Sequence, residues 1–464
     1  MSAEKISLKE KIGYSLGDTA SNLFFQTFIF FMTIFYTDVF GIPAKAVGTM
    51  FLITKIWDAV NDPMMGMLAD RTETRWGKFR PYLLWFAIPF GLLGVLTFTT
   101  PNLSVAGKLV YAYVTYTLLM MLYTIINVPY SALMGVITSN AGVRTVVSQF
   151  RFVAAFIGMI IVQFSVLRMV ETFGKGDEAL GWQLAMVVLS TLAVILLFIT
   201  FASTKERVSP PKGQKTTLKS DLRDLSKNLP WLLIGGATVC QLTYILIRNG
   251  CVIYYFRYFV QDQQVTILGN TYSYSYESMV STFLLTGSLV TILGAILANW
   301  FSKVMGKRNT YAGFLAGSAV FAALFYFLKP NDIIMMFVFQ FLFSFALGPV
   351  SVLQWAMYTD TADYSEYKTG RRATGLVMSA SLFALKFGVA LGAAILAWIL
   401  AGYGYQPNVE QTTTSLEGIK LAMSFYAAIP AFIGAALMIF YPISNKWMVE
   451  IEQDLIARRE KSSS

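Results

Sequence analysis

The sequence predicts an all-α, polytopic membrane protein with twelve transmembrane helices in two pseudo-symmetric six-helix halves. Of its 464 residues, 56% are hydrophobic and 13% are charged, whereas a soluble protein carries about a quarter charged residues. Apolar segments of about 20 or more residues recur along the whole chain, and each is long enough to cross about 30 Å of hydrocarbon. A polar stretch near the middle separates six of these segments from the other six.

The predicted spans each consist of an apolar run of membrane-crossing length. They fall at residues 12–39, 44–69, 81–100, 107–136, 146–169, 182–203, 230–259, 274–300, 311–328, 331–358, 374–402 and 418–442. The N-terminal "MSAEKISLKEK" is polar, and the first apolar run is too long and too aromatic for a signal peptide. We therefore expect no cleavable signal.

The distribution of Lys and Arg predicts the topology. An even number of spans places both termini on one side of the membrane. That side, with the even-numbered loops, carries 25 Lys and Arg residues, and the opposite side carries 7. The positive-inside rule then makes both termini cytoplasmic. The net charge of +10 is explained by this topology without a nucleic-acid partner, and we expect a monomer in a bacterial inner membrane.

Histidine is absent from the sequence, which excludes His-based proton relays, His metal sites and Ser-His triads. Cys240 and Cys251 fall in one predicted helix, about 16 Å apart and too far for a disulfide. We expect a protein that is not an enzyme and that needs no cofactor beyond a coupling ion.

The organisation of the chain is two bundles joined by a linker. The stretch "STKERVSPPKGQKTTLKSDLRDLSKNLP" is rich in Lys and lacks apolar periodicity. The predicted parts are a six-helix bundle, a cytoplasmic linker, a second bundle and a cytoplasmic tail, at residues 1–203, 204–229, 230–442 and 443–464. The loops "DRTETRWGKFRP" and "FSKVMGKRNT" echo each other in a Gly-Lys core. A 6+6 arrangement is typical of major facilitator transporters, which bind substrates near the midplane between the halves.

Polar side chains inside the spans are the functional candidates, because a charge at membrane depth costs several kcal/mol unless it is paired or solvated. The candidates are the acids Asp18, Asp58 and Asp62, the bases Lys55, Arg151, Arg248 and Lys386, and the polar residues Asn22, Thr124, Asn127 and Asn249. Static ion pairs that hold helices together are the alternative interpretation.

The segment "KIWDAVNDPMMG" predicts a cation site. Asp58 and Asp62 lie one turn apart on one helix face, and two such carboxylates repel in a low dielectric unless a cation or a proton joins them. Thr124 and Asn127, one turn apart in the fourth span, supply further oxygen ligands for a hard cation. If the ion is Na⁺, Asp58 and Asp62 are its metal ligands.

Two prolines support this site. Pro63 directly follows Asp62, and Pro129 stands two residues after Asn127. Each leaves a carbonyl one turn earlier, that of Ala59 or Ile125, without its helical partner. Such carbonyls at membrane depth are tolerated where they line a cavity or bind an ion. Coupled transport follows, because filling the acid pair removes its repulsion and each solute raises the affinity for the other.

Several long motifs then carry a family resemblance. They are "GYSLGDTASN", "FYTDVFG", "KIWDAVNDPMMG", "RWGKFRPYLL", "YTIINVPYSAL", "YTDTADYSEYKTGRRATG" and "GYQPNVEQT". The chain resembles, from end to end, the glycoside–pentoside–hexuronide:cation symporters of the major facilitator superfamily, which include the melibiose permease.

The resemblance implies roles for individual positions. Asp58, Asp62 and Thr124 match the family's cation site. Asn22, Tyr123, Asn127 and Arg151 match sugar-contacting positions, and Lys386 matches a lysine near both sites. Together with the intramembrane charges Asp18 and Arg248, we count as substrate-binding Asp18, Asn22, Tyr123, Asn127, Arg151, Arg248 and Lys386. A third set resembles the family's cytoplasmic gate and contains Arg75, Arg144, Asp360, Asp363, Glu366, Lys368 and Arg372.

Departures from the melibiose permease bear on the substrate. Asn22 and Asn127 replace acids that bind a galactoside there, Ser131 and Ser351 replace tryptophans, and Arg248 is an added charge. We therefore expect a pentoside, another glycoside or an anionic sugar such as a hexuronide. The loss of an acid at Asn127 removes one candidate sodium ligand, so Na⁺ and H⁺ both stay open as coupling ions.

Other functions are alternatives. A lipid or lysolipid transporter can use the same fold, and a passive uniporter would need no acid pair. An intramembrane prenyltransferase is suggested by "NDPMMGMLAD" and "DTADYSE", which loosely resemble magnesium-binding Asp-rich motifs. However, Asp58 and Asp62 lie too deep in the membrane for a diphosphate.

Overall fold

The structure is a computed structural model that describes residues 6–138, 141–207, 225–267, 270–369, 374–444, 447–448, 450–451 and 453–454. Helices make up most of the described chain, and ten of them are long and apolar enough to cross a membrane. The predicted all-α membrane fold is therefore confirmed.

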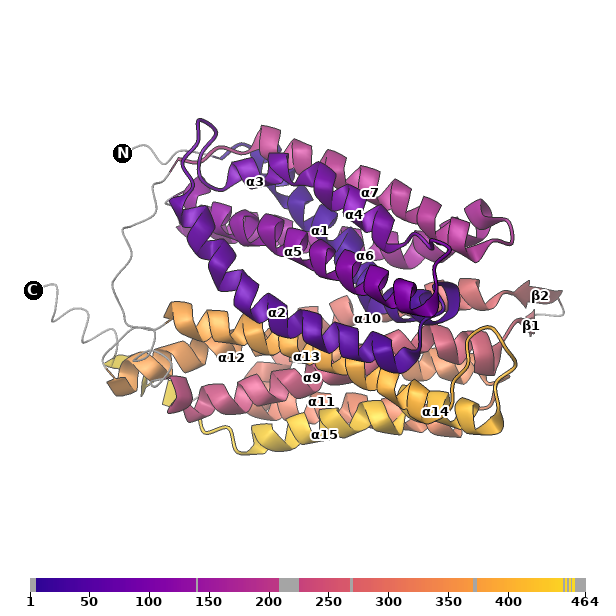
Figure 1. Cartoon of the computed structure of the whole chain (residues 1–464). Coiled ribbons are helices and arrows are strands. Elements are labelled where there is room, and N and C mark those ends of the chain that lie inside the picture. Colours follow the sequence, from indigo (N-terminus) through magenta and orange to yellow (C-terminus); the bar gives the residue numbers. More distant parts are fainter. Residues whose placement is uncertain are drawn as a thin grey trace, which may run out of the picture. The chain divides into compact units, whose positions relative to one another are not determined.

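The chain divides into two compact units, and the first consists of Met1–Gly213 with Gln406–Val409. Its helices run side by side (Figure 1) and are α1 (Leu8–Ile34), η1 (Phe35–Val39), α2 (Ala44–Arg71), α3 (Arg80–Trp85), α4 (Ala87–Thr97), α5 (Val105–Ile137), α6 (Ala141–Gly174) and α7 (Glu178–Ser203). The short segment Gln406–Val409 is attached to this unit by Asn408, whose amide donates a hydrogen bond to the carbonyl oxygen of Asp38.

The second unit consists of Gln214–Tyr405 with Glu410–Ser464. Its elements are α9 (Leu229–Tyr254), η2 (Tyr255–Val260), β1 (Gln263–Ile267), β2 (Asn270–Tyr274), α10 (Tyr276–Met305), α11 (Lys307–Leu324), η3 (Phe325–Phe327), α12 (Ile333–Thr369), α13 (Thr374–Gly402), α14 (Thr413–Met423) and α15 (Phe425–Ile439).

Helices correspond to every predicted span, although two spans fall outside the set of ten. These are α2, of which only the described part Ala44–Thr54 is counted, as a shorter apolar helix, and the α3–α4 pair, which is broken at Phe86. The break follows from Pro89, because proline has no N–H to donate and its ring clashes with the carbonyl of Trp85 one turn earlier.

The first helix of each half ends in the same irregularity. α1 continues into the π-helical segment η1, and α9 continues into the π-helical segment η2. Neither was predicted, because a hydropathy pattern does not distinguish an i→i+5 hydrogen-bond pattern from an α-helix.

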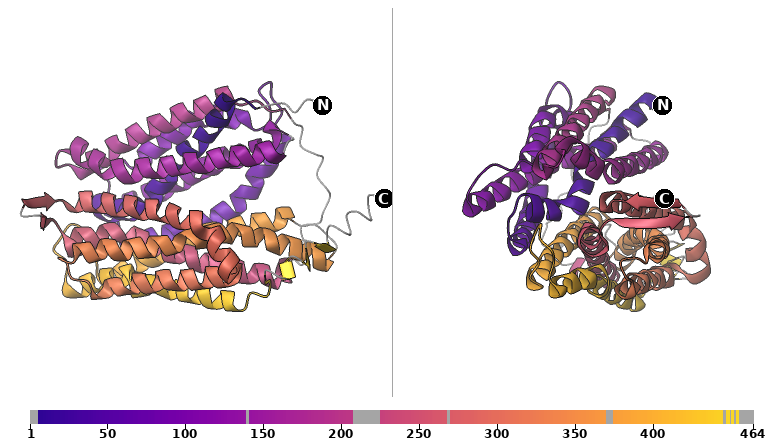
Figure 2. Two further views of the ribbon diagram at one scale, coloured as in Figure 1. Left: turned by 180° about the vertical axis from the view of Figure 1, so that it is seen from behind. Right: turned by 90° about the vertical axis from the view of Figure 1, so that its right-hand side faces the viewer.

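An antiparallel hairpin precedes α10 and was also not predicted. β1 and β2 pair in a register that places Gln263 opposite Tyr274 and Ile267 opposite Asn270. Figure 2 shows the two strands projecting beyond the neighbouring helix ends. The alternation of β-branched, aromatic and polar residues in "QQVTI" and "NTYSY" is typical of strands.

The predicted echo between two loops is present in the backbone. Gly77 has φ 107° and Gly306 has φ 82°, and each stands directly before a lysine. In the first unit the amide N–H groups of Lys78, Phe79 and Arg80 all donate to the carboxylate of Glu206, at 2.8, 2.8 and 3.0 Å. A side chain at position 77 would collide with that carboxylate, so glycine is required there by space as well as by φ.

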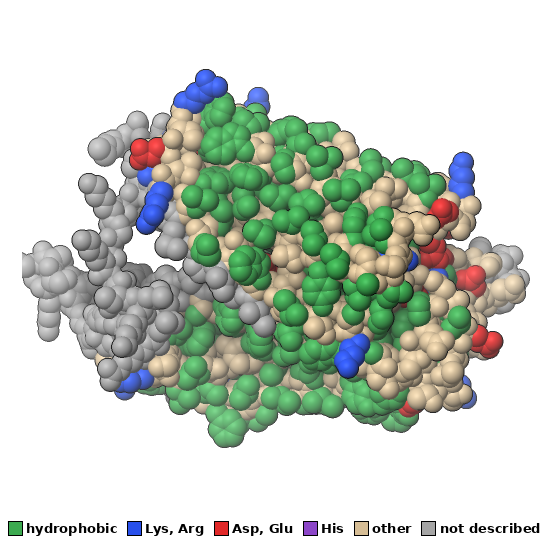
Figure 3. Space-filling view, in the orientation of Figure 1, with side chains coloured by type: hydrophobic (Ala, Val, Ile, Leu, Met, Phe, Trp, Pro, Cys, Tyr) green, Lys and Arg blue, Asp and Glu red, His purple; other side chains and the backbone are tan. Residues whose placement is uncertain are grey.

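The outward faces of the helices are apolar. Hydrophobic side chains cover most of the helices visible in Figure 3, with charged side chains concentrated toward their ends. Ile296, Ile334 and Phe440 are 69%, 76% and 72% exposed, a degree that suits contact with lipid and not with water.

Candidate functional site

An ion pair between α1 and α6 forms the centre of the polar cluster in the first unit. The Nε atom of Arg151 donates to Oδ2 of Asp18 at 2.5 Å, and its Nη2 atom donates to Oδ1 at 3.0 Å. The pair is bidentate, and the side chains are 21% and 16% exposed. Charge-assisted bonds of this kind are about twice as strong as neutral ones.

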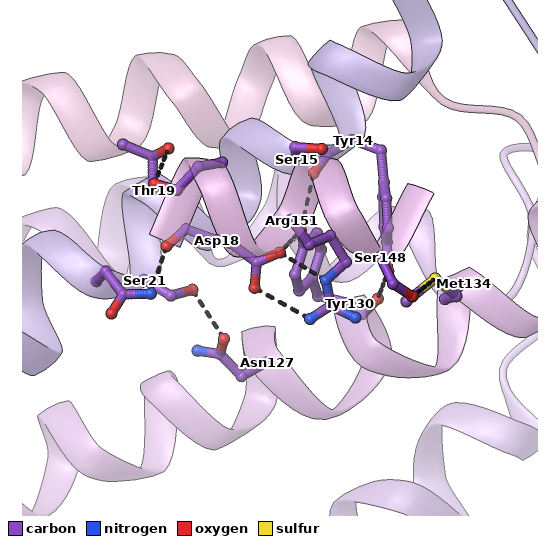
Figure 4. A network of polar contacts seen from close by, with 12 residues as sticks. Tyr14, Ser15, Asp18, Thr19, Ser21, Asn127, Tyr130, Met134, Ser148 and Arg151 are labelled. Carbon is purple, nitrogen blue, oxygen red and sulfur yellow. Dashed lines mark hydrogen bonds and ion pairs between the residues drawn. The ribbon is translucent and has the colours of Figure 1, made fainter. Parts of the chain in front are cut away.

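Two tyrosines enclose this pair (Figure 4). The hydroxyl of Tyr130 donates to Oδ2 of Asp18 at 2.7 Å. Tyr14 donates its hydroxyl to the carbonyl of Tyr130 at 2.9 Å. The carbonyl of Tyr14 lies 2.8 Å from the Tyr130 hydroxyl, whose single proton it shares with Asp18. The guanidinium carbon of Arg151 lies 4.9 Å from the ring centroid of Tyr130 and 5.5 Å from that of Tyr14. Both the charge and the orientation of Arg151 are thus fixed within the first unit.

Close helix packing allows the pair to form. A side chain at Gly158 on α6 would come within 2.9 Å of the backbone oxygen of Thr19 on α1. Thr19 in turn donates its hydroxyl to the carbonyl of Ala154 at 2.9 Å. α1 and α6 therefore approach at a glycine, which brings Asp18 within reach of Arg151.

A chain of amide and hydroxyl contacts extends from the ion pair. Ser21 donates to Oδ1 of Asn127 at 2.7 Å, and the amide of Asn127 donates to the carbonyl of Tyr123 at 2.9 Å. On α1, the amide of Asn22 donates to the carbonyl of Asp18, and Gln26 donates to Oδ1 of Asn22 at 3.1 Å. The structure thus assembles the sugar-site candidates of the first unit around the α1–α5 contact.

The predicted cation site lies at the contact between α2 and α5. Thr124 donates its hydroxyl to Oδ1 of Asp62 at 3.0 Å, and Asp58 is 2% exposed. The side chain of Asn127 accepts from Ser21 of α1 and donates to the carbonyl of Tyr123. Its hydrogen bonds are therefore made among the sugar-site candidates and not to Asp58 or Asp62. The side chains of Lys55 and Pro63 lie outside the described residues. Among the described residues, no group of three or more His, Cys, Asp or Glu is placed to hold a metal ion.

Tyr123 connects the two clusters. It is half-buried on α5, directly before Thr124, and lies within electrostatic range of Asp18, Asp58 and Asp62. Its ring stacks on Phe25 with centroids 6.2 Å apart. The cation candidates and the sugar candidates of the first unit are therefore neighbours.

The remaining substrate candidates belong to the second unit. Lys386 is half-buried on α13. Arg248 is fully buried on α9, and its guanidinium carbon lies 3.7 Å from the ring centroid of Phe343. Arg248 is thus enclosed by its own unit, and sugar contact by this residue stays a prediction.

The gate candidates are only partly described. Asp360 on α12 pairs with Lys307 at 2.7 Å within the second unit. Arg75 is exposed and lies over the ring of Trp76. Asp363 and Glu366 are half-buried on α12, and Lys368 is exposed. The side chain of Arg144 and the whole of Arg372 lie outside the described residues, so the network stays a prediction.

Three contributors to the site were missed in the sequence analysis, namely Tyr14, Ser21 and Tyr130. Tyr14 and Ser21 stand in the motif "GYSLGDTASN", and Tyr130 stands in "YTIINVPYSAL". Their spacing carried a signal, because Tyr14 and Asp18 are one turn apart on α1, and Asn127 and Tyr130 are neighbours on one face of α5.

Comparisons with known proteins agree on one family. A family model described as MFS/sugar transport protein matches residues 13–445. The chain is 38% identical to the inner membrane symporter YicJ of Escherichia coli, over 93% of this chain and 90% of the relative. It is 36% identical to the putative glycoside/cation symporter YagG of Escherichia coli (98% and 96% covered) and 34% identical to the isoprimeverose transporter of Lactiplantibacillus pentosus (96% and 91%).

Solved structures share the fold. A bacterial homologue of the human lysosomal transporter Spinster superimposes with a TM-score of 0.64 at 12% identity, over 94% of this chain and 98% of that chain. At this identity the similarity concerns the fold alone.

Proposed function

The chain belongs to the MFS/sugar transport protein family, and we propose that it is a cation-coupled symporter that moves a glycoside, pentoside or hexuronide inward by alternating access. Its named relatives are symporters or transporters, and the protein is likewise a membrane transporter and not an enzyme. The prenyltransferase alternative is therefore wrong.

The observation that carries the proposal is the α2–α5 contact. Thr124 holds one carboxylate oxygen of Asp62 at 3.0 Å, and Asp58 is buried one turn earlier on the same helix. Two buried carboxylates on one helix face favour either a bound cation or a shared proton. Oxygen ligands from Asp58, Asp62 and Thr124, with Asn127 one turn further along α5, fit Na⁺, and the acids alone fit H⁺.

The neighbouring α1–α5–α6 network supports a sugar site. A sugar hydroxyl both donates and accepts hydrogen bonds, and the network offers both functions through Asp18, Asn22, Asn127 and Arg151. Tyr123 supplies an aromatic ring beside them. We also propose Lys386, on α13, as a substrate ligand, and its positive charge would favour an anionic sugar.

Coupling follows from the adjacency of the two clusters at Tyr123. A cation that neutralises Asp58 and Asp62 lowers the cost of desolvating the pocket when sugar binds. By linkage, sugar must raise cation affinity by the same factor. The Asp18–Arg151 pair lies within one unit, so alternating access does not require it to break.

A thermal-shift screen of the purified chain tests the proposal. Glycosides, pentosides and uronates are compared with and without Na⁺ at two pH values. We expect one sugar class to raise the unfolding midpoint, and its Kd to fall when Na⁺ is added or the pH is lowered. Equal Kd values under all ionic conditions would indicate a uniporter. Uptake of a labelled lysolipid without any sugar binding would indicate the lipid transporter.

We further propose that both termini are cytoplasmic in a bacterial inner membrane. The charge bias of the loops supports this orientation. A reporter that is active only in the cytoplasm, fused to the C-terminus, should be active; an inactive fusion of a chain that still transports would contradict the orientation.

A further inference from the structure

Arg248 is a charge for which the described part of the chain supplies no counter-ion. Its side chain is 0% exposed, and among the described residues it is the largest side chain that is fully buried. None of its Nε, Nη1 and Nη2 atoms has a hydrogen-bond partner among the described residues. Arginine keeps its proton in proteins, so a positive charge is present in the interior of the second unit.

The immediate surroundings of Arg248 are aromatic. The guanidinium carbon lies 3.7, 4.8 and 5.6 Å from the ring centroids of Phe343, Phe325 and Phe283. These rings come from α12, η3 and α10. Cation–π contacts contribute about 0.5–2 kcal/mol each, whereas an uncompensated buried charge costs several kcal/mol even after relaxation. The rings alone therefore do not balance the charge.

The polar groups that face Arg248 are neutral. They belong to Tyr244, Cys251 and Tyr255, and no carboxylate is among them. The hydroxyl of Tyr255 is itself buried without a hydrogen-bond partner among the described residues. The guanidinium N–H groups only donate, and the phenol O–H can also donate, so unpaired donors around a positive charge favour an anion. Water would satisfy the donors but would leave the charge uncompensated.

We propose that Arg248 is the core of a buried binding site for a small inorganic anion of the chloride class. The guanidinium and Tyr255 donate to the ion, while Phe283, Phe325 and Phe343 exclude water. The ion that we propose is small because the Arg248 side chain is fully enclosed. The site lies within the second unit, and the proposal holds whether or not the proposed transport function is correct.

The test is the anion dependence of thermal unfolding of the purified full-length chain. Sodium gluconate is replaced stepwise by sodium chloride, bromide or nitrate at constant Na⁺ and constant ionic strength. A ligand that binds only the folded state stabilises it by RT ln(1 + L/Kd), where L is the free ligand concentration, so the midpoint rises with the logarithm of that concentration above Kd. We expect a rise of about 2–4 °C at about 100 times Kd. Any rise in sodium sulfate should be the same in the wild type and in Arg248→Met, because it comes from exclusion of sulfate from the protein surface.

Two substitutions locate the effect. Arg248→Met should abolish the chloride dependence. Arg168→Met should retain it, because Arg168 also lies over a phenylalanine, 4.0 Å from the centroid of Phe164, but is exposed. An insensitive wild type, or an unchanged dependence in Arg248→Met, overturns the site.

A third variant tests the proposal even if Arg248→Met does not fold. Arg248→Lys keeps the charge with fewer donors, so its half-saturating chloride concentration should rise about tenfold, equivalent to one lost charge-assisted hydrogen bond. In bromide-soaked crystals the anomalous signal should lie at hydrogen-bond distance from the Arg248 guanidinium. A half-saturating concentration equal to that of the wild type, or a bromide peak only elsewhere, overturns the proposal.

Discussion

Arg151 holds both carboxylate oxygens of Asp18, at 2.5 and 3.0 Å, and this contact ties α6 to α1. Tyr130 of α5 donates to the same carboxylate at 2.7 Å. Three helices of the first unit therefore meet at one carboxylate. Since removal of one partner leaves the other charge buried, a role in structure and a role in sugar binding must be separated by design.

Paired neutralisation at Asp18 and Arg151 separates these roles. Arg151→Gln alone should lower stability by about 3–5 kcal/mol, because it leaves Asp18 buried and uncompensated. The double variant Asp18→Asn/Arg151→Gln should recover most of that stability in thermal unfolding and still bind sugar at least about tenfold more weakly in titration calorimetry. Wild-type sugar affinity in the double variant would make the pair purely structural. Tyr130→Phe removes the hydroxyl proton that Asp18 and the Tyr14 carbonyl share, and it should cost about 1 kcal/mol.

Neutralising the acids of α2 should uncouple transport. Asp58→Asn and Asp62→Asn each remove a ligand for the coupling ion, so ion-driven accumulation in proteoliposomes should be lost while sugar exchange down its gradient continues. Uphill accumulation by either variant would contradict a cation site on α2. Glu171→Gln, which changes an exposed acid on α6, is the control and should accumulate sugar normally.

Thr124→Val should weaken cation binding selectively. The substitution removes the 3.0 Å hydrogen bond to Asp62, so the half-saturating cation concentration should rise about 5- to 10-fold, equivalent to about 1–1.4 kcal/mol. The maximal rate should be retained. Thr115→Val is the matched control, because Thr115 is also buried on α5 and its hydroxyl donates to backbone carbonyls of its own helix, those of Tyr111 and Ala112. Equal effects of the two variants would remove Thr124 from the site.

Glu206→Gln should destabilise the first unit. Its carboxylate accepts three amide hydrogen bonds from residues 78–80, and an amide replaces the charged acceptor and presents a donor to N–H groups. We expect a loss of about 1–3 kcal/mol, measured as a lower unfolding midpoint. Glu73→Gln should leave the unfolding midpoint unchanged. The Glu73 side chain is 82% exposed, and its ion pair with Lys78 is long, at 3.8 Å, so it contributes little to stability. An unchanged unfolding midpoint in Glu206→Gln would show that these three hydrogen bonds do not stabilise the first unit.

Gly158→Leu should separate α1 from α6. Even a Cβ atom there would lie 2.9 Å from a backbone oxygen of α1, so a larger side chain must displace a helix, at a cost of about 1–3 kcal/mol or more. Sugar affinity should fall with stability. Gly313→Ala on α11 meets no atom within 4 Å and should be neutral or stabilising. An unaffected sugar affinity in Gly158→Leu would show that the α1–α6 contact does not position the site.

Hydropathy predicted where the helices lie, since membrane-spanning helices must satisfy their own backbone hydrogen bonds and so follow the apolar runs closely. It could not predict the interruption at Ser424 between α14 and α15, where the backbone has φ −120° and ψ −97°, or the hairpin β1–β2. These depend on local backbone geometry in the polar regions and at helix joints, for which composition carries little information.

The site was predictable where charge was the signal. Asp58, Asp62 and Thr124 were grouped because buried acids need a partner, and the structure places the hydroxyl of Thr124 3.0 Å from Oδ1 of Asp62. That these residues bind a cation stays a prediction. The pairing of Asp18 with Arg151 was not specified, since three acids and four bases allow many pairings until the packing at Gly158 selects one. The roles of Tyr14 and Tyr130 arise from tertiary contact alone and leave no mark on hydropathy.

The aromatic enclosure of Arg248 also bears on how the protein is made. An arginine at the centre of a helix opposes insertion from the translocon by about 2.5–3.5 kcal/mol, and α9 must overcome this with its other residues. The rings of Phe283, Phe325 and Phe343 belong to segments synthesised later. During biogenesis α9 therefore enters the bilayer before the three aromatic rings that surround Arg248 have been synthesised. Its final placement depends on insertion of the next three spans.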